Sequence, residues 1–246
     1  MQFHSLAANT LYATKLSRPD TCTDVAFLTT IVQSTALDDW AKMVHMMRYI
    51  RGTRTLPLII SDNRSGILKW CVYASFDVHP NTRGHYGGGL SLRRGFPIVN
   101  PTKNLNTCIS TETELVGADD FMPEICWTWY FLKAKGYIVL DNILFQDNRS
   151  SIIMENNGKA SSIKRNKHIK TWYLFITNRV AQDDVSLVWC PTGDMIGEFM
   201  TKPPQGALFR KFRDQIMGVI PEQDPGPGKA QPGKAQTGKG KPRKGK

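Results

Sequence analysis

The chain has 246 residues, of which 41% are hydrophobic, and it carries a formal net charge of +11. This length and composition suit one large domain or two small ones with a buried core, and they exclude a wholly disordered chain. The positive charge favours polyanions, with nucleic acid as the default partner.

Residues 1–66 are predicted to form a small helical segment. Apolar residues recur near helical spacing, and capping residues and glycine mark the ends of each run. Three helices are expected, at 6–16, 25–32 and 38–52.

Residues 67–218 alternate strand-like and helix-like segments. Strands are predicted at 68–74, 87–92, 97–99, 142–146 and 185–189. Helices are predicted at 111–135, directly after Asp147, at 168–180 and at 194–200. This order predicts an α/β fold with a mixed sheet flanked by helices.

The longest predicted helix has a clear apolar face. From Leu115 to Leu132 its apolar positions step by three and four residues, which is the spacing of one helix face. Pro123 falls inside this helix and is expected to kink or split it. Glu112 and the Asp119-Asp120 pair are expected to face solvent.

Residues 219–246 are rich in proline, glycine and lysine and almost lack apolar residues. This composition predicts a disordered basic tail, because it cannot build a hydrophobic core. The tail is either a solvated end or a nonspecific electrostatic arm for nucleic acid. Part of the net charge lies here, so the remaining chain is only moderately basic.

The five cysteines are widely spaced, which predicts reduced and mostly buried thiols in a reducing compartment. No apolar run approaches the roughly 20 residues of a membrane span. Residues 1–5 lack the positive flank and apolar core of a signal peptide. We therefore expect an intracellular protein without a membrane partner, in the cytoplasm, a virus-like particle or the nucleus.

Two acidic segments carry the most information. Glu114 lies near the start of the long helix, within Ser110–Asp120, and Asp147 directly follows a short apolar strand. Metal-dependent phosphodiester hydrolysis needs several carboxylates that converge from such ends.

These segments and their order resemble the ribonuclease H domain of copia-type (Pseudoviridae-like) retrotransposon Pol polyproteins. Upstream, Arg18-Pro19-Asp20 and 48–53 resemble the C-terminal end of the reverse transcriptase. The resemblance covers about residues 2–218 and implies a ribonuclease H-like mixed five-stranded sheet. The paired aspartates of the polymerase are absent, because Asp38-Asp39 reads as a helix start.

The resemblance also implies a chemistry. The family hydrolyses RNA in RNA/DNA hybrids with two Mg²⁺ (or Mn²⁺) ions held by four carboxylates, and without a small-molecule cofactor. Carried over residue by residue, the ligands are Glu114, Asp147 and Glu198, the last where the family usually has aspartate. The rest of the Pol polyprotein is an expected partner.

The first-strand position departs from the family pattern. The family has Val-Asp-Ala-Ser-Phe there, whereas this chain reads Val72-Tyr73-Ala74-Ser75-Phe76. A phenol is neutral at pH 7 and is a poor ligand of Mg²⁺. With Tyr73 in place of the catalytic aspartate, we expect weak or no hydrolysis.

Further contacts to substrate are less specific. His168 could approach substrate or product, although a lone histidine before a helix is more often structural. Recognition of a hybrid would depend on shape and on 2′-hydroxyl groups. Residues expected to contact nucleic acid are Arg83, Lys103, Ser110, Thr111, Asn148, Lys164, Arg165 and Lys167.

Each of these acidic residues also has an interpretation without a catalytic role. Glu114 alone would suit a solvated first-turn acid, Asp147 a helix cap, and Glu198 a surface charge. Trp129 and Tyr86 are further departures from the family pattern that point toward decay. Three functions stay open: a ribonuclease H-type hydrolase, a catalytically dead nucleic-acid-binding relic, and a pseudogene product without a selected function.

Overall fold

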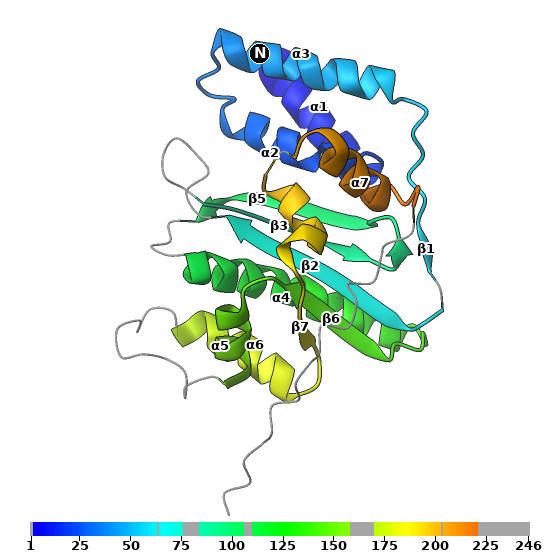
Figure 1. Cartoon of the computed structure of the whole chain (residues 1–246), viewed down its shortest axis with the longest axis vertical. Coiled ribbons are helices and arrows are strands. Elements are labelled where there is room, and N and C mark those ends of the chain that lie inside the picture. Colours follow the sequence, from blue (N-terminus) through cyan, green and yellow to red (C-terminus); the bar gives the residue numbers. More distant parts are fainter. Residues whose placement is uncertain are drawn as a thin grey trace, which may run out of the picture.

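The computed structural model describes residues 2–62, 64–75, 84–105, 110–157, 170–202 and 204–220. One mixed five-stranded sheet lies in the middle of the molecule, and helices cover both of its faces (Figure 1). The expected α/β class with a ribonuclease H-like sheet is therefore confirmed. The predicted basic tail lies outside the described residues from 221 onward.

The sheet has the strand order β5-β3-β2-β6-β7. Its strands are β2 (Ile67–Ser75), β3 (Gly84–Ser91), β5 (Ile98–Leu105), β6 (Asp141–Gln146) and β7 (Ser186–Trp189). The β5-β3-β2 part is antiparallel, whereas β2-β6-β7 is parallel. Cys71 of β2 lies opposite Phe145 of β6, so Asp147 comes level with Tyr73 two residues further on. Strand pairing thus brings together two positions that are 74 residues apart in the sequence.

One face of the sheet is covered by α4 (Ser110–Ala134), with α5 (Arg149–Asn157) and α6 (Lys170–Ala181) beyond it (Figure 1). The predicted apolar face of α4 is buried against β2 and β3. The helix continues without a break through Pro123, so the expected split is wrong. Phe121 and Ile125 pack into the core on either side of the proline, and this packing compensates for the missing backbone donor.

The opposite face is covered by the 3₁₀ helix η5 (Ile196–Met200), α7 (Gly206–Ile216) and α2 (Cys22–Thr30). Their side chains form a second core with β2 and β5, which includes Cys22, Phe199 and Phe212. The Thr23 hydroxyl donates a hydrogen bond to the Phe199 carbonyl. Helix α7 was not predicted, although Phe209, Phe212 and Ile216 have helical spacing.

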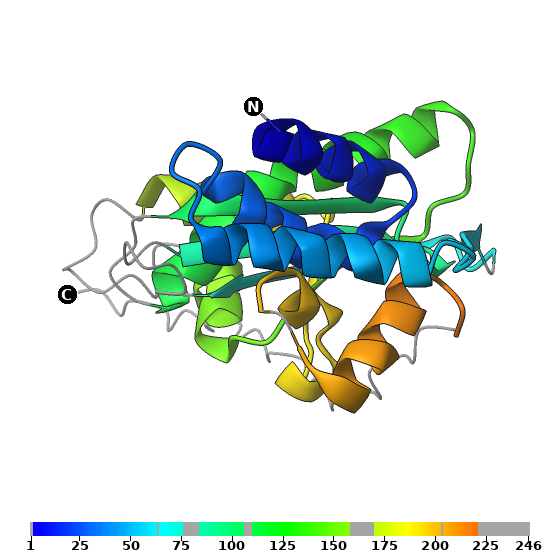
Figure 2. The same cartoon turned by 90° about the horizontal axis from the view of Figure 1, so that it is seen from above.

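The N-terminal helices α1 (Gln2–Leu16) and α3 (Leu37–Gly52) pack with α2 above the sheet, as Figure 2 shows. Between α1 and α2, the short helix η1 (Pro19–Thr21) carries Asp20 into a buried network. Asp20 accepts two hydrogen bonds from Arg18, at 2.9 and 2.8 Å, and one from the Tyr49 hydroxyl at 2.6 Å. The network joins the two segments that carry the upstream resemblance.

The remaining elements are small. Strands β1 (Ser61–Asp62) and β4 (Arg93–Arg94) form a two-stranded ladder, and η4 (Thr192–Asp194) precedes η5. Among the described cysteines, all four are buried and outside disulfides, as predicted. In the described ranges, no helix combines the length and apolar character that crossing a membrane would require.

Gly197→Ala should lower the free energy of unfolding by about 1–3 kcal/mol, the usual cost of overpacking. A Cβ at this position would come within 2.8 Å of the Tyr73 Cβ, because η5 lies directly on β2. Gly193→Ala is the control, since a Cβ there meets nothing within 4 Å, and it should change stability by less than about 0.5 kcal/mol. Urea unfolding measures both, and equal losses would contradict the close contact.

Candidate active-site cleft

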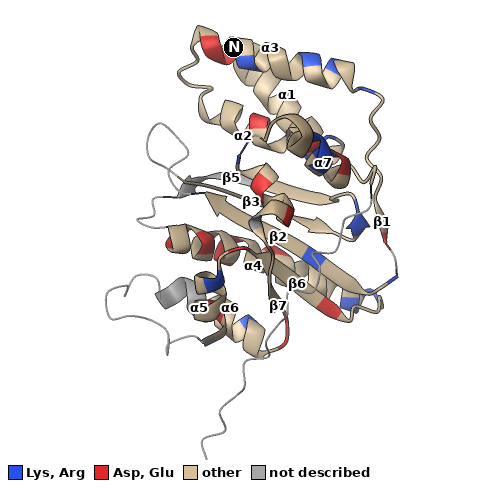
Figure 3. Cartoon of the chain, in the orientation of Figure 1, with Lys and Arg blue, Asp and Glu red and all other residues tan. Residues whose placement is uncertain are grey.

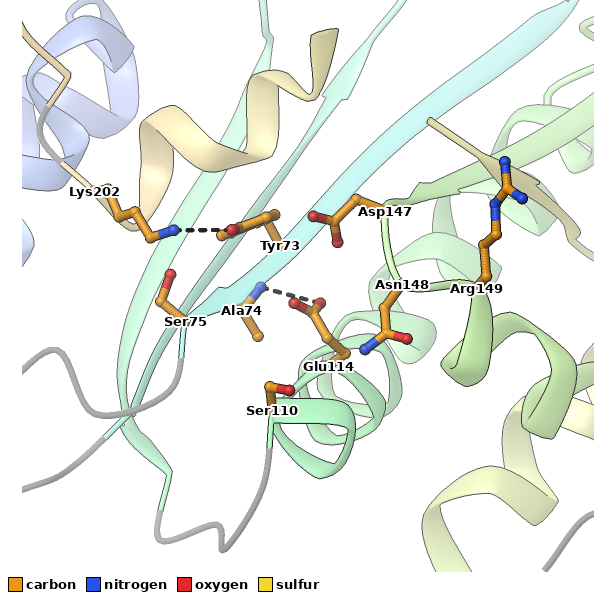
Figure 4. Close-up of a pocket in the computed structure, with 9 residues that line it drawn as sticks. All are labelled: Tyr73, Ala74, Ser75, Ser110, Glu114, Asp147, Asn148, Arg149 and Lys202. Carbon is orange, nitrogen blue, oxygen red and sulfur yellow. Dashed lines mark hydrogen bonds between the residues drawn. The ribbon is translucent and has the colours of Figure 1, made fainter. Parts of the chain in front are cut away.

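A cleft of about 510 Å³ opens where β2 and β6 end and where α4 and α5 begin (Figure 4). Predicted catalytic positions and predicted nucleic-acid positions line it together. These are Tyr73, Glu114 and Asp147 in the first group, and Ser110 and Asn148 in the second. The structure therefore brings these five predicted site residues together at one cleft.

Glu114 points from α4 toward β2 and is only 6% exposed. One carboxylate oxygen, Oε2, accepts the backbone N–H of Ala74 at 3.2 Å. Burial raises the pKa of Glu114 well above its usual range, and the negative charge of Asp147 raises it further. Glu114 is thus not the solvated first-turn acid of the non-catalytic interpretation.

Asp147 is held at the junction between β6 and α5. Its backbone carbonyl accepts the indole N–H of Trp189 at 3.1 Å. The next residue, Asn148, caps α5, because its Oδ1 accepts the N–H groups of Ser150 and Ser151 at 3.0 and 3.2 Å. The cap belongs to Asn148, which leaves the Asp147 carboxylate at the cleft, as Figure 4 shows.

Tyr73 lies in the middle of the site and is 7% exposed. Burial raises the pKa of its hydroxyl, and the negative charges of Asp147 and Glu198 act in the same direction against the effect of Lys202. The phenol is therefore neutral at physiological pH, as expected from the sequence.

Glu198 and Lys202 approach Tyr73 from η5 and the turn after it. The Lys202 ammonium donates a hydrogen bond to the Tyr73 Oη at 3.0 Å and lies 3.6 Å from Oε1 of Glu198. Partial burial opposes the charged form of Lys202, but its bond to Tyr73 and the charge of Glu198 together raise its pKa. Lys202 thus stays cationic and partly neutralises Glu198.

These donors do not fit a two-ion Mg²⁺ site. Across the described parts of the chain, no three carboxylate, imidazole or thiolate groups come together as metal ligands. Position 73 offers a neutral phenol where a bridging carboxylate is needed, and Lys202 places an ammonium beside Glu198. Two carboxylates, Glu114 and Asp147, remain at the cleft.

Several predicted contacts fall elsewhere. Thr111 lies in the first turn of α4, beside Ser110. Lys103 belongs to β5, but its side chain is outside the described part. The candidates that lie wholly outside the described residues are Arg83, Lys164, Arg165, Lys167 and His168.

Two basic residues of the cleft were missed by sequence reasoning. Lys202 stands in the same segment as Glu198 but was not singled out, and Arg149 follows the Asp147-Asn148 pair directly. Their basic character was a usable signal, whereas their positions at the cleft depend on the fold. The prediction for Glu112 was wrong, because this side chain is 4% exposed and points into the structure.

A buried pair lies behind the site. Gln146, the last residue of β6, donates through Nε2 to Oε1 of Glu155 on α5 at 3.0 Å. Glu155 is fully buried, and burial raises the pKa of its carboxyl to about 7. Within the described part of the chain, the Gln146 Oε1 and Glu155 Oε2 atoms have no hydrogen-bond partner.

Comparison with known proteins finds similarity to a curated protein at low identity. No family model matches the chain. The chain is 26% identical over 210 residues to the retrovirus-related Pol polyprotein from transposon RE2 of Arabidopsis thaliana, an alignment that covers 83% of this chain. The chain spans only 14% of the length of that polyprotein.

Two solved structures are similar to this chain at lower sequence identity. Ribonuclease H1 from the halophilic archaeon Halobacterium salinarum shares 10% identity, with a TM-score of 0.36, over 53% of this chain and 90% of that enzyme. The prototype foamy virus protease-reverse transcriptase shares 13% identity, with a TM-score of 0.31, over 77% of this chain and 28% of that protein.

Glu155→Gln should stabilise the chain near pH 8 by up to roughly 3 kcal/mol. Folding raises the pKa of this carboxyl from 4.5 to about 7, so between these pH values the folded chain holds a proton that the unfolded chain has lost. The free energy of unfolding therefore falls as the pH rises through this range. The amide that replaces the carboxyl does not ionise, so this loss of stability disappears. Its N–H can also donate a hydrogen bond to the Gln146 Oε1. Urea unfolding between pH 4 and pH 8 measures the effect.

Asp62→Asn is the matched control, because Asp62 is an exposed carboxylate in β1. It should leave the pH dependence of stability unchanged. A wild-type stability that does not fall between pH 4.5 and pH 8 would contradict the burial of an ionisable Glu155.

Proposed function

We propose, from the homology to a retrotransposon Pol polyprotein and the ribonuclease H-like sheet, that this chain binds RNA/DNA hybrids but hydrolyses their RNA weakly or not at all. The chain is a ribonuclease H-like domain of a retroelement Pol polyprotein. Its copia-type subclass, its hybrid substrate and its loss of activity are parts of the proposal.

The observation that carries the proposal is the contact between Tyr73 and Lys202. In the two-ion mechanism, carboxylates clamp two ions that activate water and stabilise the leaving oxygen. Here the central position holds a neutral phenol, and an ammonium lies 3.0 Å from its oxygen. The centre of the site therefore lacks a carboxylate and has an ammonium beside it, whereas the family chemistry requires a ligand for two divalent cations there.

The cleft retains features that suit a nucleic-acid backbone. It lies at the first turns of α4 and α5, where the helix dipoles favour anions. Lys202 and Arg149 supply positive charge at its edges, and Ser110 supplies a hydroxyl. Such contacts position a backbone without reading its sequence, which supports binding in the absence of cleavage.

In place of the expected Mg²⁺ or Mn²⁺ site, we therefore propose that this cleft binds metal ions weakly or not at all. Acidic residues lie on α4 and on η5, which cover opposite faces of the sheet (Figure 3). Apart from Glu198, which stands where the family usually has aspartate, only the central position separates this arrangement from the family's set of carboxylates. A single substitution should therefore test whether the rest of the site is intact.

Tyr73→Asp should raise Mg²⁺-dependent cleavage of a labelled RNA/DNA hybrid by at least about 10-fold, because it restores a carboxylate between Asp147 and Glu198. Wild type should cut at background rates with either Mg²⁺ or Mn²⁺. Gel analysis of the RNA strand measures the rate.

Two further variants serve as controls. Tyr73→Phe keeps the ring without a carboxylate and should remain inactive, and adding Glu114→Gln to Tyr73→Asp should abolish the restored cleavage. If wild type already cleaves and Glu114→Gln alone abolishes it, then Tyr73 is tolerated and the proposed impairment is wrong.

A further inference from the structure

Lys202 occupies a special place at the cleft. It follows η5 in the chain, and η5 lies so close to β2 that a Cβ on Gly197 would touch Tyr73. The Lys202 side chain then reaches back to the Tyr73 hydroxyl, as the dashed line in Figure 4 shows. Its ammonium also stands within 5.3 Å of the centre of the Tyr73 ring. The lysine is thus positioned by contacts to a residue at the centre of the site.

The Lys202 ammonium still has capacity to bind a ligand. A lysine ammonium carries three N–H donors. Tyr73 accepts one of them, and Glu198, at 3.6 Å, attracts another. The side chain is 48% exposed and lines the cleft, so one donor remains for a bound group.

The neighbouring donors suit an anion. The Tyr73 Oη accepts a hydrogen bond from Lys202, which leaves its own O–H able to donate to a ligand. Ser110 adds a hydroxyl at the start of α4, where the helix dipole is positive. Arg149, fixed at 4.1 Å over the Trp189 ring, adds a second cation on another side of the cleft.

We propose that Lys202, together with the Tyr73 hydroxyl, binds a backbone phosphate of the nucleic acid directly and without a divalent metal. The substitution that removed a metal ligand thereby created a phosphate site of a different kind. This inference rests on the proposed hybrid binding, and it names the contact that replaces the metal-mediated one.

The charge balance decides the class of ligand. A phosphodiester carries one negative charge and accepts hydrogen bonds through two terminal oxygens, which match the Lys202 and Tyr73 donors. Asp147 opposes an anion here, so the contact should contribute a modest share of the affinity. Glu198 opposes it less, because its carboxylate is already paired with Lys202.

The test measures hybrid binding by the full chain with fluorescence anisotropy, using a labelled RNA/DNA hybrid at about 100 mM salt. Wild type should bind equally well in EDTA and in Mg²⁺, within about two-fold. Lys202→Met should weaken binding about 5- to 10-fold and reduce the salt slope by about one phosphate contact. Lys202→Arg keeps the charge and should bind within about two-fold of wild type.

Lys211→Met is the matched control. Lys211 lies on α7, pairs with Asp194 at 3.4 Å and is absent from the cleft lining. Its substitution removes the same charge as Lys202→Met, but at a position outside the cleft lining. It should therefore change the affinity by less than about two-fold. Circular dichroism and urea unfolding check that each variant is folded. Tyr73→Phe, which keeps the ring and removes only the hydroxyl, should weaken binding about 2- to 3-fold and gives a second readout.

The outcomes separate the two proposals. If wild type does not bind the hybrid at all, the proposed function itself is wrong. If wild type binds but folded Lys202→Met binds equally well, the phosphate contact is wrong and the proposed binding stands. If Mg²⁺ tightens wild-type binding more than about 10-fold, a metal mediates the contact and the inference is overturned.

Discussion

The close packing of η5 on β2 is the constraint on which the site depends. Gly197 lies directly against Tyr73, and only a residue without a side chain fits there. This contact lets Phe199 and Met200 enter the core, and it directs the following Lys202 back toward the cleft. A tyrosine carries its hydroxyl further from the backbone than an aspartate carries its carboxylate. The longer side chain reaches the lysine and forms a hydrogen-bonded pair of phenol and ammonium.

The same core explains how the N-terminal helices affect the site. Cys22 on α2 is fully buried in the cluster that contains Tyr73 and Phe199, and Thr23 donates to the Phe199 carbonyl. Helix α2 therefore supports η5 from the side opposite to β2. The network of Arg18, Asp20 and Tyr49 fixes α2 relative to α3 in turn. Residues far from the cleft thus help to hold Lys202 in position.

The other departures from the family pattern are accommodated by the fold. Tyr86 is 7% exposed, packs against Phe121 and donates its hydroxyl to Asp120 on α4. Trp129 is 5% exposed, and the Lys133 ammonium lies 3.7 Å from the centre of its ring. Large aromatic residues with satisfied partners favour a folded domain. They support the binding and the hydrolase hypotheses over a chain that has lost its fold.

The sequence by itself determined the order of the main elements up to η5, the buried face of α4 and the positions of Glu114 and Asp147. These follow from local periodicity and from the places where helices begin and strands end, which neighbouring residues control. Through the family resemblance, it also singled out Tyr73 as the departure that is expected to limit the chemistry. The continuity of α4 through Pro123 and the burial of Glu112 and Glu155 were decided by the tertiary structure, because packing from distant segments outweighs local preference. The same holds for the partner of Tyr73: Lys202 is 129 residues away, and no local spacing indicates a contact that arises only when η5 crosses the sheet.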